Sequence, residues 1–97
     1  MSGGLSKVKS SDNDVDSIVN TLKSDIEEKL LKELIELKCD SYKTQVVAGV
    51  NYYIKAKIDK NEYIFLKVFR DLPHNNQKDK LISVQVDKKI TDEIAFF

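Results

Sequence analysis

Two side chains in this sequence, one thiol and one imidazole, could together carry out nucleophilic chemistry. Cys39 is the single cysteine and His74 the single histidine among 97 residues, and an imidazole that activates a thiolate is a known catalytic arrangement. However, Cys39 lies at a predicted helix-to-strand junction, His74 lies in a predicted loop, and no third group that could orient the imidazole is evident. We expect a small buried thiol, an exposed imidazole and no catalytic residue.

The remaining charged side chains do not suggest a metal or nucleic-acid site. Glu27-Glu28, Asp92-Glu93 and Lys88-Lys89 are adjacent doublets of the kind found on solvated faces, and none has the spacing of metal ligands. Sixteen basic residues balance sixteen acidic ones and are spread along the chain, so no basic stripe is available for phosphates. We expect no metal, no cofactor and no nucleic-acid partner.

A third chemical feature is apolar and lies in Gln45–Gly49, which reads Gln-Val-Val-Ala-Gly. A hairpin tip at this place would normally carry Asn, Asp, Gly or Ser. One explanation is that a buried strand continues through these residues, with a bulge at Gly49. The other is an exposed apolar patch that inserts into a groove of a partner. The residues by themselves leave both explanations open.

The elements that position these residues follow from hydrophobic periodicity. A three-to-four spacing of apolar residues from Val15 to Leu37 predicts one long amphipathic helix over about 13–37. Residues 1–12, with two glycines and four serines, predict a mobile arm. After Asp40 the period changes to two, which predicts four strands. These strands are expected near 42–47, 52–58, 64–69 and 82–86.

This order of elements predicts a single α+β domain over 1–97, since a chain that is 41% apolar and 97 residues long can form one core. One helix should pack against an antiparallel meander sheet of four to five strands. Successive loops of a meander lie at alternate ends of the sheet, so the tip at Val47–Gly49 and the loop at Pro73–Gln77 should share one end, opposite Asp59–Glu62.

The cellular compartment is predicted from what the sequence lacks. A single cysteine allows no internal disulfide, which suits a reducing compartment. No apolar run reaches the length of a signal peptide or a membrane span. We therefore expect a cytoplasmic protein without a membrane partner.

The segment around the apolar tip matches a known family. Tyr42–Tyr53, which reads YKTQVVAGVNYY, closely resembles the first hairpin of the cystatins, and especially of their disulfide-free cytosolic branch, the stefins. Further matches are Gly3–Leu5, Leu66–Phe69, Leu72–His74 and Gln85–Lys88, so the resemblance covers essentially the whole chain.

The resemblance implies a reversible, tight-binding, competitive inhibitor of papain-like, cathepsin-like cysteine proteases. In that family a wedge made of the arm and two hairpin loops fills the active-site cleft without being cleaved. The positions of this sequence that match the wedge are Gly3, Gly4, Gln45, Val46, Val47, Ala48, Gly49, Leu72, Pro73 and His74. Since only Met1 and Ser2 precede the arm glycines, we expect the arm to contribute less than the tip.

Other functions stay open at this stage. The cystatin-like fold could serve as a protein-binding module without protease inhibition, and an enzyme is the weakest option. The active form should be a monomer. If the tip forces Val47 into an unfavourable backbone conformation, opening the hairpin into one strand over about 41–58 would permit a domain-swapped dimer. The apolar tail with Ile90, Ile94, Phe96 and Phe97 is expected to fold back on the sheet, or else to touch the protease.

Overall fold

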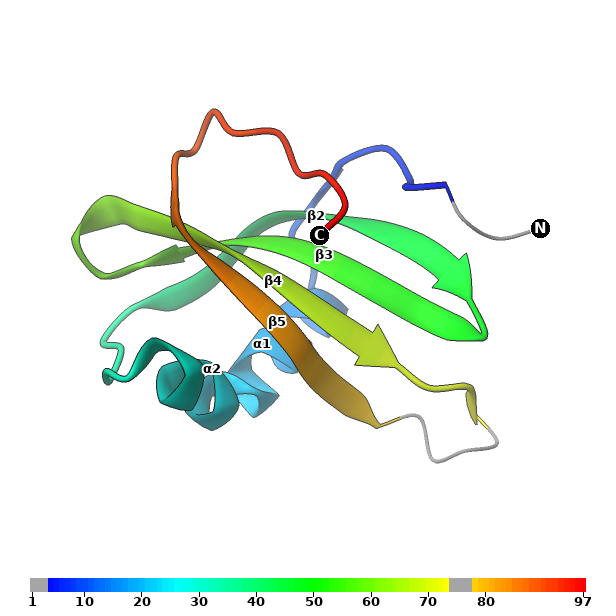
Figure 1. Cartoon of the computed structure of the whole chain (residues 1–97), viewed down its shortest axis with the longest axis horizontal. Coiled ribbons are helices and arrows are strands. Elements are labelled where there is room, and N and C mark those ends of the chain that lie inside the picture. Colours follow the sequence, from blue (N-terminus) through cyan, green and yellow to red (C-terminus); the bar gives the residue numbers. More distant parts are fainter. Residues whose placement is uncertain (1–3, 74–77) are drawn as a thin grey trace.

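The computed structural model describes residues 4–73 and 78–97. In this part of the chain, an antiparallel sheet with the strand order β1-β2-β3-β4-β5 wraps around two short helices (Figure 1). The strands are β1 (Lys9–Ser10), β2 (Leu37–Val47), β3 (Gly49–Ile58), β4 (Glu62–Arg70) and β5 (Asp79–Lys88). The helices are α1 (Asn13–Thr21), α2 (Lys23–Leu30) and the 3-10 turn η1 (Asp59–Asn61). The predicted α+β meander is confirmed.

The helix is shorter than predicted and is interrupted. Asp12 caps the start of α1 by accepting a hydrogen bond from the Val15 amide at 2.9 Å. The helical dihedral angles are interrupted at Leu22, and α2 ends before Leu31, whose φ of 59° is left-handed. The predicted end near residue 37 is therefore wrong, because Leu37 is the first residue of β2.

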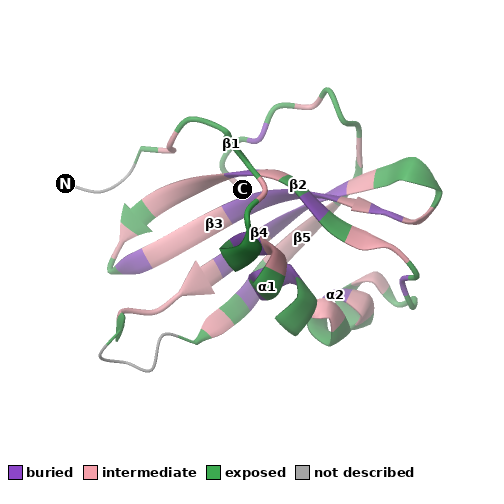
Figure 2. Ribbon diagram, turned by 180° about the vertical axis from the view of Figure 1, so that it is seen from behind, coloured by how far each residue is buried: buried purple, intermediate pink, exposed green. Residues whose placement is uncertain are grey.

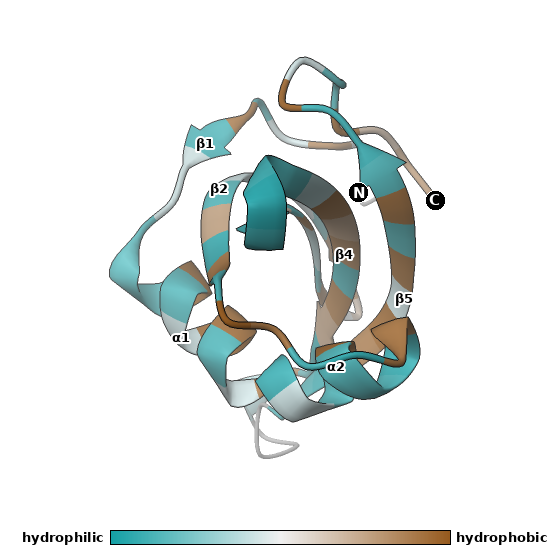
Figure 3. Ribbon diagram, turned by 90° about the vertical axis from the view of Figure 1, so that its left-hand side faces the viewer, coloured by the Kyte–Doolittle hydropathy of each residue, from teal (hydrophilic) through white to brown (hydrophobic). Residues whose placement is uncertain are grey.

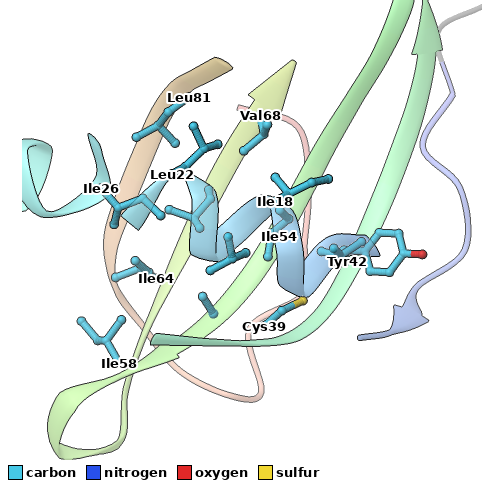
Figure 4. Packing of buried hydrophobic residues seen from close by; sticks show 14 of the residues in the cluster. Ile18, Leu22, Ile26, Cys39, Tyr42, Ile54, Ile58, Ile64, Val68 and Leu81 are labelled. Atoms are coloured by element: carbon cyan, nitrogen blue, oxygen red, sulfur yellow. The ribbon is translucent and has the colours of Figure 1, made fainter. Parts of the chain in front are cut away.

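Apolar residues from both helices and one face of the sheet form the main core. Figure 3 shows the helices closing the open side of the curved sheet, and Figure 4 shows the side chains that meet there. The helices contribute Val15, Ile18, Val19, Leu22 and Ile26, and the sheet contributes Ile54, Ala56, Ile64, Leu66 and Val68. Each of these side chains is almost fully buried, so burial of this face is the main stabilising contribution to the fold.

The opposite face of the sheet is covered by the C-terminal tail, residues 89–97, as expected (Figure 1). Tyr53, Phe65 and Ile94 form a second, smaller cluster. Three lysines on this face bind carbonyl oxygens of the tail through their Nζ atoms. Lys43 binds Ile94 at 2.8 Å, Lys55 binds Ile90 at 2.7 Å and Lys67 binds Phe97 at 3.1 Å. The sheet is therefore packed on both faces.

Among the described residues, no helix has the length and apolar character needed to cross a membrane.

Candidate functional site

The first hairpin tip and the start of the second loop lie at one end of the sheet (Figure 1). The register explains this, since Val50 at the start of β3 pairs with Arg70 at the end of β4. The turn at Asp59–Asn61 lies at the opposite end. The predicted arrangement of loops is confirmed for the residues that the structure describes. His74 and Gly3 lie outside them.

The tip is a tight turn with exposed apolar side chains. Val47 of β2 pairs with Gly49 of β3, which leaves Ala48 as the connecting residue. Val46 is 61% exposed, Ala48 is exposed and Val47 is half-buried. Figure 2 shows an exposed band close to the end of β2 and a buried residue at the start of β3. The strand does continue into the tip, but the patch it presents is exposed, which favours the second of the two explanations above.

Gly49 is the buried residue of the tip and packs tightly against the end of β4. Its φ of +131° lies in a region that other residues rarely adopt. A Cβ atom at this position would lie 2.6 Å from the Arg70 carbonyl oxygen and 2.7 Å from the ring of Phe69. Both the backbone dihedral angle and the lack of room for a side chain thus require a glycine here. The glycine allows the first tip to pack directly against Arg70, the last residue of β4.

Gln45 is fixed from the outer face of the sheet. Its Oε1 atom accepts hydrogen bonds from Asn51 Nδ2 at 3.1 Å and from the Tyr53 hydroxyl at 3.2 Å. The Tyr53 ring, in turn, makes edge contacts with the rings of Phe96 and Phe97 in the tail, at centroid distances of 5.8 and 5.5 Å. These hydrogen bonds therefore hold the side chain of Gln45, the first residue of the tip, in one orientation.

Part of the predicted arm runs beside β2. The Ser6 amide donates to the Thr44 carbonyl at 2.8 Å, the Thr44 amide donates to Ser6 Oγ at 2.9 Å, and Lys9 pairs with Tyr42 in the sheet. Gly4 is exposed, and a methyl group added to it would meet nothing within 4 Å. The contacts of Ser6 and Lys9 bring the arm toward the first tip. The mobility predicted for 1–12 stays a prediction.

The second loop begins with one half-buried and one exposed residue. Leu72 is partly covered and its amide donates to Asp71 Oδ1 at 2.8 Å, whereas Pro73 is exposed. Across the base of the loop, the Asp71 amide donates to the Lys78 carbonyl at 3.3 Å. Pro73 has a fixed φ, so the start of the loop has little backbone freedom.

Cys39 lacks the properties of a nucleophile. It is 2% exposed in β2, and burial raises the pKa of its thiol to about 11. A nucleophilic cysteine instead needs a lowered pKa and access to solvent.

The Tyr42 hydroxyl donates a hydrogen bond to Asp12 Oδ2 at 2.6 Å, which raises the pKa of Tyr42 to about 12 and lowers the pKa of Asp12. This hydrogen bond connects β2 to the N-terminal cap of α1.

Among the described residues, no group of three or more His, Cys, Asp or Glu could hold a metal ion.

Sequence reasoning missed several residues that support the tip and the loop. Asn51 and Tyr53 hold Gln45, and Arg70 with Asp79 closes the second loop. The Arg70–Asp79 pair could have been predicted from the sequence, because residues of opposite charge lie on either side of the loop. No comparable signal existed for Tyr53, because its partner depends on strand register.

Comparison with known proteins gives matches over the whole chain. A family model described as the cystatin domain matches residues 3–91. Cystatin-A of Homo sapiens is 44% identical over 95 residues, which is 98% of this chain and 97% of that protein. Leukocyte cysteine proteinase inhibitor 1 of Sus scrofa is 39% identical over 97 residues, covering 100% and 94%. Stefin-C of Bos taurus is 36% identical over 95 residues, covering 98% and 94%.

Proposed function

The chain belongs to the cystatin family, in its stefin branch, and from this premise we propose that it is a reversible, tight-binding, competitive inhibitor of papain-like cysteine proteases. The related leukocyte protein from Sus scrofa is named as a cysteine proteinase inhibitor. The chain is accordingly not an enzyme. Its proposed targets are cathepsin-like proteases with a cleft that an apolar wedge can fill.

The hairpin tip is the observation that carries this proposal. Val46 and Ala48 expose apolar surface to solvent. Gly49 packs against the end of β4, and Gln45 accepts a hydrogen bond from Tyr53. A surface that is ordered before binding loses little side-chain and loop entropy on docking, so more of its contact energy becomes affinity. Occlusion of a cleft requires such a rigid apolar edge and no bond to the catalytic cysteine.

The proposed contact residues extend beyond the tip to the arm and the second loop. Leu72 and Pro73 lie at the same end of the sheet as the tip, and the arm runs toward it along β2. The full proposed set is Gly3, Gly4, Gln45, Val46, Val47, Ala48, Gly49, Leu72, Pro73 and His74. We further propose a cytoplasmic location, in keeping with the reduced, buried Cys39.

A titration of papain with the intact protein and two matched variants tests the proposal. Val46→Asp places a charge where the protease should bury an apolar side chain, and we expect the inhibition constant to rise at least about thirty-fold, or ~2 kcal/mol. Val86→Asp is the control, since Val86 is 51% exposed at the far end of β5, and it should inhibit like the wild type. Equal loss in both variants, or no inhibition by the wild type, would reject the proposed wedge.

The same titration ranks the arm against the tip. Deletion of residues 1–4 should weaken inhibition less than Val47→Asp does, because glycines offer no side chain for apolar contact, whereas the aspartate places a charge in the apolar tip. A deletion that abolished inhibition while Val47→Asp kept it would reverse this ranking.

The active form is proposed to be the monomer, and a domain-swapped dimer would bury the tip in a long strand. Val47 is not among the described non-glycine residues with positive φ, which are Leu31, Lys60, Asn61 and Asp87. A positive φ at Val47 is therefore not the source of the backbone strain that would favour opening of the hairpin. Separation by size, followed by titration of each fraction, tests the assignment: a dimer that inhibits as well as the monomer would refute it.

A further inference from the structure

Arg70, the last residue of β4, lies between the two loops of the proposed wedge. Its carbonyl oxygen lies directly behind Gly49, so close that a Cβ atom there would approach it to 2.6 Å. The first tip is thus supported by the main chain of Arg70. The next residue along the chain, Asp71, begins the connection to β5 that contains the second loop.

The guanidinium of Arg70 closes the base of that second loop. Nε donates to Asp79 Oδ1 at 2.7 Å and a terminal nitrogen donates to Asp79 Oδ2 at 3.2 Å. Arg70 and Asp79 are also register partners, the first residue pair on either side of the connection 71–78. Their side chains are 18% and 16% exposed. A two-point pair with this degree of shielding is stronger and more directional than an ordinary surface ion pair.

The same guanidinium is held from two further directions. Another terminal nitrogen binds the carboxylate of Asp14 in α1 at 3.0 and 3.3 Å, although that carboxylate is 59% exposed. The guanidinium carbon also lies 5.4 Å from the centre of the Tyr52 ring. Since three neighbours fix the side chain, its orientation toward Asp79 is set before any partner binds.

We propose that Arg70 is a positioning residue for inhibition, which connects the first tip to the start of the second loop at Asp71–Pro73. Its main chain supports the first tip, and its side chain, paired with Asp79, holds the two ends of the connection 71–78 together at the sheet. The inference rests on the proposed function, and it adds that affinity depends on a contact that does not itself face the protease. Loss of the pair should loosen Asp71–Pro73 at the start of the second loop, so that a complex forms but dissociates faster.

Two variants of the same guanidinium's partners separate this role from general stability. Asp79→Asn and Asp14→Asn each remove one negative charge next to Arg70, but only Asp79 lies at the base of the loop. With papain, we expect Asp79→Asn to raise the dissociation rate constant about tenfold, with a small change in the association rate constant. Asp14→Asn should stay within about twofold. Arg70→Lys, which keeps the charge but lacks the two-point geometry, should behave like Asp79→Asn.

A second readout does not depend on inhibition. The Asp71 amide, which donates across the loop base to Lys78, should exchange with solvent faster in Asp79→Asn than in Asp14→Asn. If the wild type does not inhibit papain, the proposed function fails, and this exchange difference still supports the clamp, while its absence overturns it. If the wild type inhibits, equal dissociation rates for the two variants overturn the positioning role, even where exchange differs.

Discussion

Gly49 and Gly4 differ in the room that each has for an added methyl group. At Gly49 the methyl would meet the Arg70 carbonyl at 2.6 Å with φ at +131°, whereas at Gly4 it would meet open space. We expect Gly49→Ala to lower the free energy of unfolding by about 3 kcal/mol, and Gly4→Ala to change it by less than about 0.5 kcal/mol. Denaturant unfolding of both variants measures this. A similar decrease in the free energy of unfolding for Gly49→Ala and Gly4→Ala would mean that the tip does not pack closely against β4.

The tip also shows how far residue types can be interpreted without coordinates. An apolar hairpin tip is unusual enough to predict exposure for binding, and the exposed Val46 agrees with that. The hydrogen bonds from Asn51 and Tyr53 to Gln45 could not be predicted, because a one-residue shift in register would place these side chains on opposite faces.

At the scale of elements, the end of α2 is formed by a residue that is poorly suited to it. Leu31 adopts φ 59° and ψ 35°, its amide donates to the Glu28 carbonyl, and the Lys32 amide donates to the Glu27 carbonyl. This is the Schellman arrangement, in which glycine is usual because a side chain in the left-handed region is unfavourable. Leu31 is 90% exposed, so it gains little burial in return.

Leu31→Gly should therefore stabilise the protein, by about 0.5–1 kcal/mol in the free energy of unfolding. Glu33→Gly is the matched control, because Glu33 is exposed and has no positive φ, and it should be neutral or destabilising. Thermal and denaturant unfolding of the two variants provide the comparison. A loss of stability in Leu31→Gly would show that the exposed leucine has a packing role.

This unusual helix end is the reason that the helix boundary was predicted wrongly. Leu34 and Leu37 continue the helical spacing of apolar residues, and neither glycine nor proline interrupts it. In the structure Leu34 is buried in the turn after α2, where its amide binds Glu27 Oε2 at 2.7 Å, and Leu37 begins β2. Periodicity alone cannot separate such residues from a longer helix. The meander, by contrast, follows from the alternation in its strands and its short connections, and was predicted correctly.

At the scale of the whole molecule, the sheet separates two unequal clusters of buried residues. The helix-side core is large, and the outer cluster of Tyr53, Phe65 and Ile94 depends on a tail without regular structure. Lys55, which is 8% exposed, binds the Ile90 carbonyl and lies 5.9 Å from the centre of the Phe65 ring. The lysine stems and the aromatic rings together hold the tail to the sheet.

Two isoleucines of this tail provide the test, since Ile94 is 2% exposed and Ile90 is 55% exposed. Ile94→Ala should lower the free energy of unfolding by about 2–4 kcal/mol, and Ile90→Ala by less than about 1 kcal/mol, because only the first leaves a cavity. Denaturant unfolding measures both, and each variant keeps the carbonyl that a lysine binds. Equal and small losses would show that the tail does not pack on the sheet in solution. Because Ile94 packs in the same cluster as Tyr53, and Tyr53 holds Gln45, Ile94→Ala should also weaken papain inhibition more than Ile90→Ala does.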